Sequence, residues 1–280
     1  MAKTAEKKAY LDKVSREVPE YAEVLALFRE LYAAIDGREG ETGISFALPD
    51  NLSVERVRQG IPLLSVESLS VDREKAAAFI GIVIDVMLRV GNDADESLER
   101  LRAALANGTV DLTALLRACL ARERKAVMEA AVAVQIQPPL LEFALETPLR
   151  TALQQAAEAL DPALTEGWEE RFCPVCGSRP GMGELTGEEG RHYLSCSACS
   201  HRWPSARHAC PFCGNEEPDK LTYFTADDGP DRVDVCLTCT RYIKTRDSRK
   251  GNAGVPLEAE NLATIHLDLA AAREGYERGQ

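Results

Sequence analysis

The chain has 280 residues, of which 45% are apolar and 28% are charged, and its formal net charge is −12. This composition is typical of a globular protein with a sizeable core, and it excludes a disordered chain. The acidic balance argues against a partner bound mainly through its phosphates, because such binding needs Lys and Arg to neutralise negative charge.

The sequence predicts a cytoplasmic protein without a membrane span. The most apolar run, residues 76–88, is interrupted by Asp85, and it falls well short of the ~20 residues that a transmembrane helix needs. The N-terminus, M-A-K-T-A-E-K-K, is charged, whereas a signal peptide has an apolar core. Thiols stay reduced in the cytoplasm, which bears on the nine cysteines of the chain.

Residues 1–168 contain one cysteine and are predicted to form an all-α domain of about six helices. An apolar stripe at helical spacing predicts the first clear helix, which Asp36-Gly37 ends. Ser70 and Asp72 are the candidate caps of a helix whose run 76–88 is apolar nearly all round, so we expect it in the middle of a bundle. The helices are expected at 21–35, about 72–90, 94–106, 112–134, 140–145 and 148–160, with a loop at 38–51 and Pro148 in the first turn of the last helix.

Residues 169–280 hold the other eight cysteines in a repeated pattern. Four C-x-x-C pairs begin at Cys173, Cys196, Cys210 and Cys236. In each copy a hairpin-like stretch joins two pairs, and an aromatic residue follows the second pair. Two copies of one small unit are the simplest account. The hairpins are expected at 182–195 and 221–235 with turns at 187–190 and 227–229, the aromatic residues are Trp203 and Tyr242, and a closing helix is expected at 257–276.

The cysteine spacing predicts two tetrahedral metal sites. Two C-x-x-C turns on one hairpin complete an S₄ site, and the spacings C-x₂-C-x₁₉-C-x₂-C and C-x₂-C-x₂₂-C-x₂-C suit that arrangement. A glycine after the second cysteine tolerates the tight turn that brings backbone N–H groups to sulfur. The predicted ligand sets are Cys173, Cys176, Cys196 and Cys199 for one ion, and Cys210, Cys213, Cys236 and Cys239 for the other.

Other interpretations of the cysteines stay open at this point. A disulfide framework conflicts with the expected compartment, and a thioredoxin-like redox pair lacks its βαβ setting. An interleaved pairing of the four C-x-x-C turns is a further alternative. Four thiolates accept zinc or iron, and the ligands alone favour zinc.

The rest of the sequence offers few catalytic or binding motifs. No phosphate-binding loop, dinucleotide-binding glycine motif, zinc-protease motif or nucleophile elbow occurs. Cys119, among leucines on a predicted helix, is expected to be a buried core thiol. From Glu169 onward there are 14 Lys and Arg against 18 Asp and Glu. The one basic concentration is expected to be a solvated loop or a docking patch for an acidic segment or a phosphate; it comprises Arg241, Lys244, Arg246, Arg249 and Lys250.

Three strings carry a family resemblance: R-F-C-P-V-C-G-S-R-P at Arg171, R-H-Y-L-S-C-S-A-C at Arg191 and C-L-T-C-T-R-Y-I-K at Cys236. Trp203, Arg207, the string L-T-Y-F-T-A-D-D and the terminal L-D-L-A-A-A-R-E-G-Y continue the pattern. Over nearly all of residues 170–277 the chain resembles the formate dehydrogenase accessory proteins, the FdhE family. In the helical half, G-I-P-L-L at Gly60 is the best local match.

The resemblance implies a function and an architecture. It implies a non-enzymatic cytoplasmic factor that binds the catalytic subunit of formate dehydrogenase and is needed for the activity of the dehydrogenase. The expectation that the protein binds no nucleic acid comes from the acidic charge balance. It also implies two rubredoxin-like modules and favours iron over zinc. The expected fold is α plus small metal-stabilised β: an all-α domain at 1–168, zinc-ribbon-like or rubredoxin-like four-cysteine modules at 169–208 and 209–256, and a C-terminal helix at 257–280.

The contact surface for the dehydrogenase is expected beside the cysteine turns. Trp, Tyr and Arg often dominate interface energy, and the candidates that match family positions are Arg179, Trp203, Arg207, Tyr242 and Lys244. For the two aromatics the alternative is that they only cover their metal turns. Two other functions stay open: an iron–tetrathiolate electron-transfer protein, or a zinc-ribbon protein associated with nucleic acid through its basic cluster.

Overall fold

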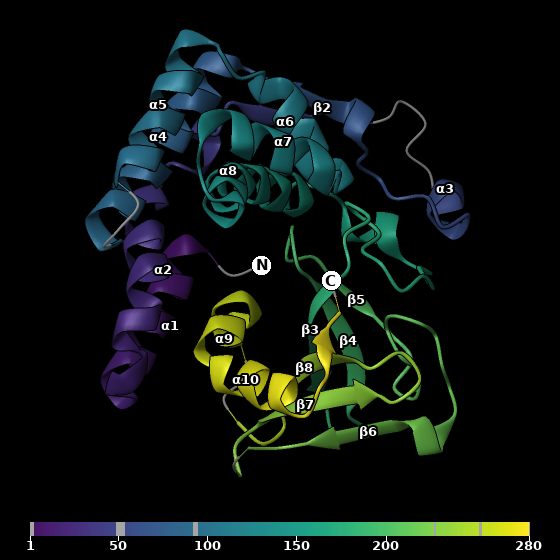
Figure 1. Cartoon of the computed structure of the whole chain (residues 1–280). Helices are drawn as coiled ribbons and strands as arrows, with labels where there is room; N and C mark the ends of the chain where they lie inside the picture. Colours follow the sequence, from purple (N-terminus) through teal and green to yellow (C-terminus); the bar gives the residue numbers. More distant parts are fainter. Residues whose placement is uncertain (1–2, 49–53, 92–94, 227, 252–253, 280) are drawn as a thin grey trace. The chain divides into compact units, whose positions relative to one another are not determined.

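The computed structural model describes residues 3–48, 54–91, 95–226, 228–251 and 254–279, which fall into two compact units (Figure 1). The helical unit comprises Lys3–Pro49 and Leu64–Ala156. The cysteine-rich unit comprises Ala157–Gln280 together with Asp50–Leu63 and the first two residues. Within the described residues, no helix is both long enough and apolar enough to cross a membrane.

The helical unit is built around α4 (Arg73–Val90), as its apolar sequence predicts. Side chains on several sides of this helix are buried, including Phe79, Ile80 and Val86. The carboxylate of Asp72 accepts a hydrogen bond of 3.3 Å from the N–H of Lys75, so Asp72 is the cap. The other helices are α1 (Thr4–Glu17), α2 (Ala22–Ile35), α5 (Asp95–Asn107), α6 (Leu112–Ala121), α7 (Arg124–Val134) and α8 (Pro138–Glu158).

Two helix boundaries in this unit differ from the prediction. The helix expected over 112–134 is broken at Arg122, whose φ of +59° lies in the left-handed region, so α6 ends there and α7 begins. Conversely, α8 continues through Pro148, which was expected to start a new helix. Proline has no N–H, so this part of the helix lacks one backbone donor. The hydroxyl groups of Thr147 and Thr151 donate to the carbonyls of Phe143 and Thr147, one turn back, at 2.7 and 2.9 Å.

The stretch 38–51, expected to be a loop, contributes a short strand where it is described. β1 (Ile44–Phe46) pairs antiparallel with β2 (Leu69–Val71). Strands of three residues give too short an alternation to be recognised in the sequence. The α-helical half therefore carries a small two-stranded sheet, while residues 49–51 of the expected loop lie outside the described residues.

The cysteine-rich unit contains one sheet that both repeats share, with the order β5-β4-β3-β8-β7-β6 and β9 paired to β8. Each repeat contributes three antiparallel strands, and the two predicted hairpins are β3–β4 and β6–β7. β3 and β8 pair in parallel and join the first strand of one repeat to the last of the other. The strands are β3 (Pro180–Thr186), β4 (Arg191–Cys196), β5 (Arg202–Pro204), β6 (Leu221–Phe224), β7 (Asp231–Cys236), β8 (Arg241–Asp247) and β9 (Glu277–Arg278). Asp227, in the second predicted turn, lies outside the described residues.

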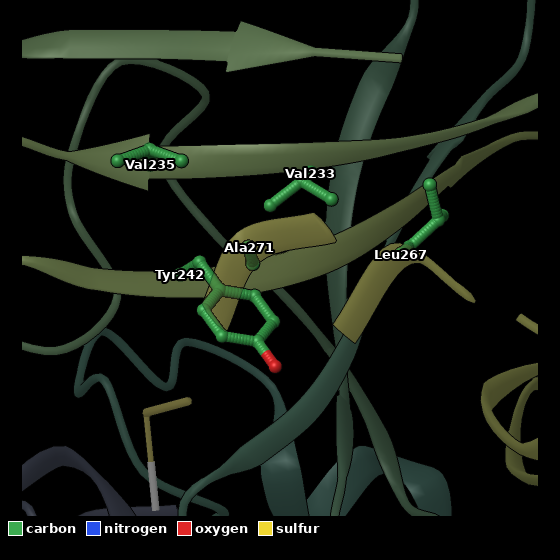
Figure 2. Close-up of a cluster of buried hydrophobic side chains, with 5 residues drawn as sticks. All are labelled: Val233, Val235, Tyr242, Leu267 and Ala271. Carbon is green, nitrogen blue, oxygen red and sulfur yellow. The ribbon is translucent and has the colours of Figure 1, made fainter. Parts of the chain in front are cut away.

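Helices α9 (Leu257–Ala263) and α10 (Ile265–Arg273) follow the sheet, where one helix was expected. Leu267 and Ala271 of α10 pack with Val233, Val235 and Tyr242 of β7 and β8 in one buried cluster (Figure 2). The break between the helices falls at Thr264. The chain thus has the predicted fold class: helices first, then a sheet with two four-cysteine groups, then C-terminal helices.

Candidate metal centres

The eight cysteines form the two predicted groups of four. In each group the four sulfur atoms lie within 4.8 Å of one another. Sγ–Sγ distances are 3.5 Å for Cys173–Cys199 and for Cys176–Cys196, 3.8 Å for Cys210–Cys239, and 3.7 Å for Cys213–Cys236. A tetrahedral ion with metal–sulfur bonds of ~2.3 Å needs sulfurs about 3.8 Å apart, whereas a disulfide needs about 2.05 Å. All nine cysteines are free, so the grouping is confirmed and both groups suit a tetrahedral metal ion.

The first C-x-x-C turn has the same backbone pattern in both repeats. The N–H of Cys173 donates to the carbonyl of Ser178, and the N–H of Cys210 donates to that of Asn215, both at 2.8 Å. Each of these turns ends in a glycine with positive φ, +69° at Gly177 and +76° at Gly214. The predicted role of these glycines is confirmed, because the left-handed region is costly for other residues.

The second C-x-x-C turn of each repeat uses the same backbone conformation without glycine. Ser200 and Thr240 follow Cys199 and Cys239, with φ of +58° and +55°. All four turns therefore end in a left-handed residue. For a β-branched threonine this region is a genuine outlier, and the sequence gives no sign of it.

Backbone N–H groups point at the sulfur atoms, as a thiolate site requires. The N–H groups of Ala198 and Cys199 donate to Cys196 Sγ at 3.3 and 3.4 Å, and that of Phe212 donates to Cys210 Sγ at 3.4 Å. Burial is the main cause that raises the pKa of the Cys173 thiol well above its ordinary value. A bound divalent cation would supply the positive charge that keeps all four sulfurs ionised.

The two sites differ in their exposure to solvent. In the first site Cys173 and Cys199 have no exposed surface, and Cys176 is half-buried. In the second site Cys213, the counterpart of Cys176, is exposed, and Cys239, the counterpart of Cys199, is half-buried. The two sites therefore share the same arrangement of ligands but differ in how far solvent reaches their cysteines.

Three of the five expected contact residues are buried. Trp203, Tyr242 and Lys244 are 1%, 4% and 0% exposed, and such side chains cannot touch a partner in this structure. Tyr242 packs beneath α10 and does not simply cover a metal turn. Arg179 is half-buried and Arg207 is exposed, and their role in binding stays a prediction.

The basic cluster is not one patch: Lys244 and Arg246 are buried, whereas Arg249 and Lys250 are exposed in the turn after β8. Most of it lies on β8, whose side chains from Tyr242 to Asp247 are buried. Arg246 forms ion pairs with Asp231, at 3.1 Å, and with Glu260. Arg249 holds both carboxylate oxygens of Asp247 at 2.7 Å. The sequence of this strand, R-Y-I-K-T-R-D, does not reveal that Asp231 and Glu260, from elsewhere in the chain, pair with Arg246.

Cys119 stands apart from the metal sites, on α6. Burial, with smaller contributions from Glu146 and Glu142, raises the pKa of its thiol to about 12. The thiol therefore stays protonated at neutral pH, which does not suit a nucleophile.

The comparisons with known proteins fall on this cysteine-rich region and on the whole fold. Residues 172–207 match the family model described as FdhE, central domain. Over 116 residues the chain is 38% identical to a protein FdhE homolog of Aquifex aeolicus and 33% identical to protein FdhE of Escherichia coli. Over 171 residues it is 32% identical to an FdhE homolog of Edwardsiella ictaluri.

These alignments span part of each protein. They cover 40% of this chain and 40% and 37% of the first two relatives, and 58% of this chain and 54% of the third. The crystal structure of the FdhE protein from Pseudomonas aeruginosa matches over 98% of this chain and 93% of that chain, with a TM-score of 0.68 and 22% identity. That likeness shows a shared fold. The resemblance to the FdhE family that the cysteine motifs predict is therefore confirmed over the part of the chain that these alignments cover, and residues 172–207 are similar to the central domain of that family.

Proposed function

We propose that this protein is a non-enzymatic accessory factor in the maturation of a formate dehydrogenase. In this role it binds the catalytic subunit of the dehydrogenase in the cytoplasm, and the dehydrogenase needs it in order to become active. One observation carries the proposal: the FdhE central-domain match at 172–207 includes all four cysteines of the first metal site and the strands between them.

In this role the metal sites act as supports and the surface around them makes the contact. Four thiolate ligands fill the tetrahedral coordination sphere of each ion, so no coordination position stays open for a substrate. Of the expected contact residues, Arg179 and Arg207 keep exposed surface. Both belong to the cysteine-rich unit, which we propose as the part that meets the dehydrogenase. We also propose that the protein divides into domains at residues 168, 208 and 256, so that the two four-cysteine modules are 169–208 and 209–256.

Iron is the metal that we propose for both sites, on the strength of the family resemblance, with zinc as the alternative. Four thiolates accept either ion in tetrahedral geometry. Anaerobic purification from the native host followed by elemental analysis and visible spectroscopy separates them, because ferric thiolate sites are coloured and zinc sites are not. Two equivalents of zinc and no iron would overturn the choice of iron.

The exposure of Cys213 favours a second candidate function, a one-electron relay through an iron–tetrathiolate site. A relay needs an ion close to the surface, and the second site offers one. Reversible bleaching by a reductant and electron transfer from a reductase would support it. No comparable observation favours the nucleic-acid hypothesis, since Lys244 and Arg246 of the basic cluster are buried and ion-paired.

The test of the accessory role is affinity capture from the native host, with mass spectrometry of the bound proteins. Wild-type protein is expected to enrich the catalytic subunit of a formate dehydrogenase. The double variant Arg179→Ala/Arg207→Ala is expected to keep its metal and melting temperature but capture less of the subunit. Arg117→Ala/Arg124→Ala, two exposed arginines of the helical unit, is the control. A wild-type capture without any formate dehydrogenase subunit would contradict the proposal.

A further inference from the structure

We propose that the two metal sites differ in function: the first site holds its ion permanently, and the second exchanges its ion with the solvent. The second module is then the metal-responsive part of the protein. The ions concerned are thiophilic divalent cations such as Zn²⁺ or Fe²⁺. The inference depends on the two four-cysteine sites and not on the accessory role, so either can fail alone.

A segment from the first half of the chain covers the first turn of the first site. This segment is 60–63, directly after α3 (Val54–Arg58), and it lies in the same compact unit as the site. The N–H of Leu63 donates a 2.9 Å hydrogen bond to the carbonyl of Pro174, inside the C-P-V-C turn. A Cβ at Gly177 would lie 3.2 Å from Cγ of Pro62. The segment therefore packs directly on the turn that carries Cys173 and Cys176.

Helix α9 covers the second turn of the same site. The hydroxyl of Ser200, which follows Cys199, donates to the carboxylate of Glu258 at 3.1 Å. Cys199 itself has no exposed surface. Both turns of the first site are thus held closed by elements from elsewhere in the chain, and the ion can leave only after one of them moves.

The second site is covered less completely, although the N–H of Glu277 donates to the carbonyl of Thr240, the counterpart of Ser200, at 2.9 Å. Pro211 corresponds to Pro174, and among the described residues no backbone N–H donates to its carbonyl. Gly279 packs against the ring of Phe212, and Arg171 lies over Gly214, but Cys213 stays exposed. In the other turn of the site Cys239 is half-buried, whereas its counterpart Cys199 has no exposed surface. Solvent therefore reaches Cys213 and Cys239 more readily than the corresponding cysteines of the first site.

Accessibility decides the rate at which a chelator or a competing thiol removes an ion. Exchange at a thiolate site proceeds when an incoming ligand reaches the metal as one sulfur leaves. At the second site Cys213 can leave without any other element moving, whereas the first site needs local opening. Equal ligand sets and equal geometry make the cover the main difference between the sites.

The test uses the full chain loaded with two equivalents of zinc. Release to a chromophoric chelator is followed over time, and samples are alkylated and digested so that mass spectrometry identifies the freed cysteines. We expect two phases of one equivalent each, with the fast phase at least about tenfold faster. Cys210, Cys213, Cys236 and Cys239 should be labelled in the fast phase. A single phase, or earlier labelling of Cys173, Cys176, Cys196 and Cys199, would overturn the proposal.

A matched pair of variants tests whether the cover is the cause. Pro62→Ala removes the contact on Gly177 and should speed release from the first site alone. Ile61→Ala alters the neighbouring side chain, which is 40% exposed, and should leave both rates unchanged. An unchanged slow phase in Pro62→Ala and in Ser200→Ala would contradict the role of the cover, and circular dichroism confirms that each variant is folded.

Discussion

The ammonium group of Lys244 lies 2.6 Å from the carboxylate of Asp268, and Lys244 has no exposed surface. The same nitrogen donates to the carbonyls of Asn261 and Thr264, at 2.6 and 3.2 Å. A lysine has three donors, and here each has an acceptor. One of those acceptors, the carbonyl of Asn261, lies in the last turn of α9, where carbonyls lack helical partners. The carbonyl of Thr264 also accepts the N–H of Leu267 of α10, at 3.0 Å. Lys244 of β8 therefore binds groups from both C-terminal helices and stabilises their packing against the sheet.

Replacing Lys244 by methionine should lower the free energy of unfolding by about 3 kcal/mol, because it removes the ammonium group that pairs with a largely buried carboxylate and with the carbonyl of Asn261. Arg278, 2.9 Å from Asp268, compensates in part. The measurement is urea denaturation with the metal bound. Lys250→Met, at an exposed position, should change the value by less than about 0.5 kcal/mol. Equal effects of the two substitutions would show that the buried pair has no structural role.

The burial of Lys244 illustrates what the sequence could not predict. Its partners lie 17 to 24 residues further along the chain, on helices whose packing is a tertiary property. The grouping of the cysteines, in contrast, was predictable, because each set lies on one hairpin and the spacing fixes which turns meet. The segment 60–63 had a local signal, the string G-I-P-L-L, but its place over a metal turn had none.

Thr240→Gly should stabilise the second module by up to about 1 kcal/mol. The left-handed conformation costs threonine roughly 1–2 kcal/mol, and the greater backbone entropy of unfolded glycine offsets part of the gain. Gly214→Ala should act in the opposite direction, since its φ is +76° and Arg171 occupies the space of a Cβ. Thermal melting of the metal-loaded protein measures both. A Thr240→Gly protein that melts lower than wild type would show that the hydroxyl bond to the Cys239 carbonyl outweighs the strain.

Asp231 should make stability depend on pH. Burial and the nearby Glu260 together raise the pKa of its carboxyl to about 8, against the opposing effects of Arg246 and Lys244. The folded protein then binds this proton more tightly than the unfolded chain, whose pKa is near 3.8. The stabilisation of the folded state by the proton on Asp231 is complete below about pH 4 and is lost as the pH rises through 8.

Urea denaturation of the metal-loaded protein between pH 6 and 8 tests this expectation. The free energy of unfolding of the wild type should fall by up to about 1.4 kcal/mol per pH unit. Asp231→Asn cannot bind the proton and should show a much flatter profile. Parallel profiles of the two proteins would exclude Asp231 as the titrating group.

Metal content should be two ions per chain, one for each group of four cysteines. Cys196→Ser should retain one ion, because each set of ligands lies within its own repeat. Native mass spectrometry of anaerobically purified protein counts the ions directly. If Cys196→Ser loses both, the β3–β8 pairing makes the repeats depend on one another, and the sites are not independent.

The sharpest test of the accessory role is formate dehydrogenase activity in the native host after deletion of this protein. Formate-dependent dye reduction in cell extracts should be lost on deletion and restored by the wild-type chain. It should not be restored by Cys196→Ser/Cys236→Ser, which removes one ligand from each site, although the dehydrogenase subunits are still made. Undiminished activity in the deletion strain would contradict the account.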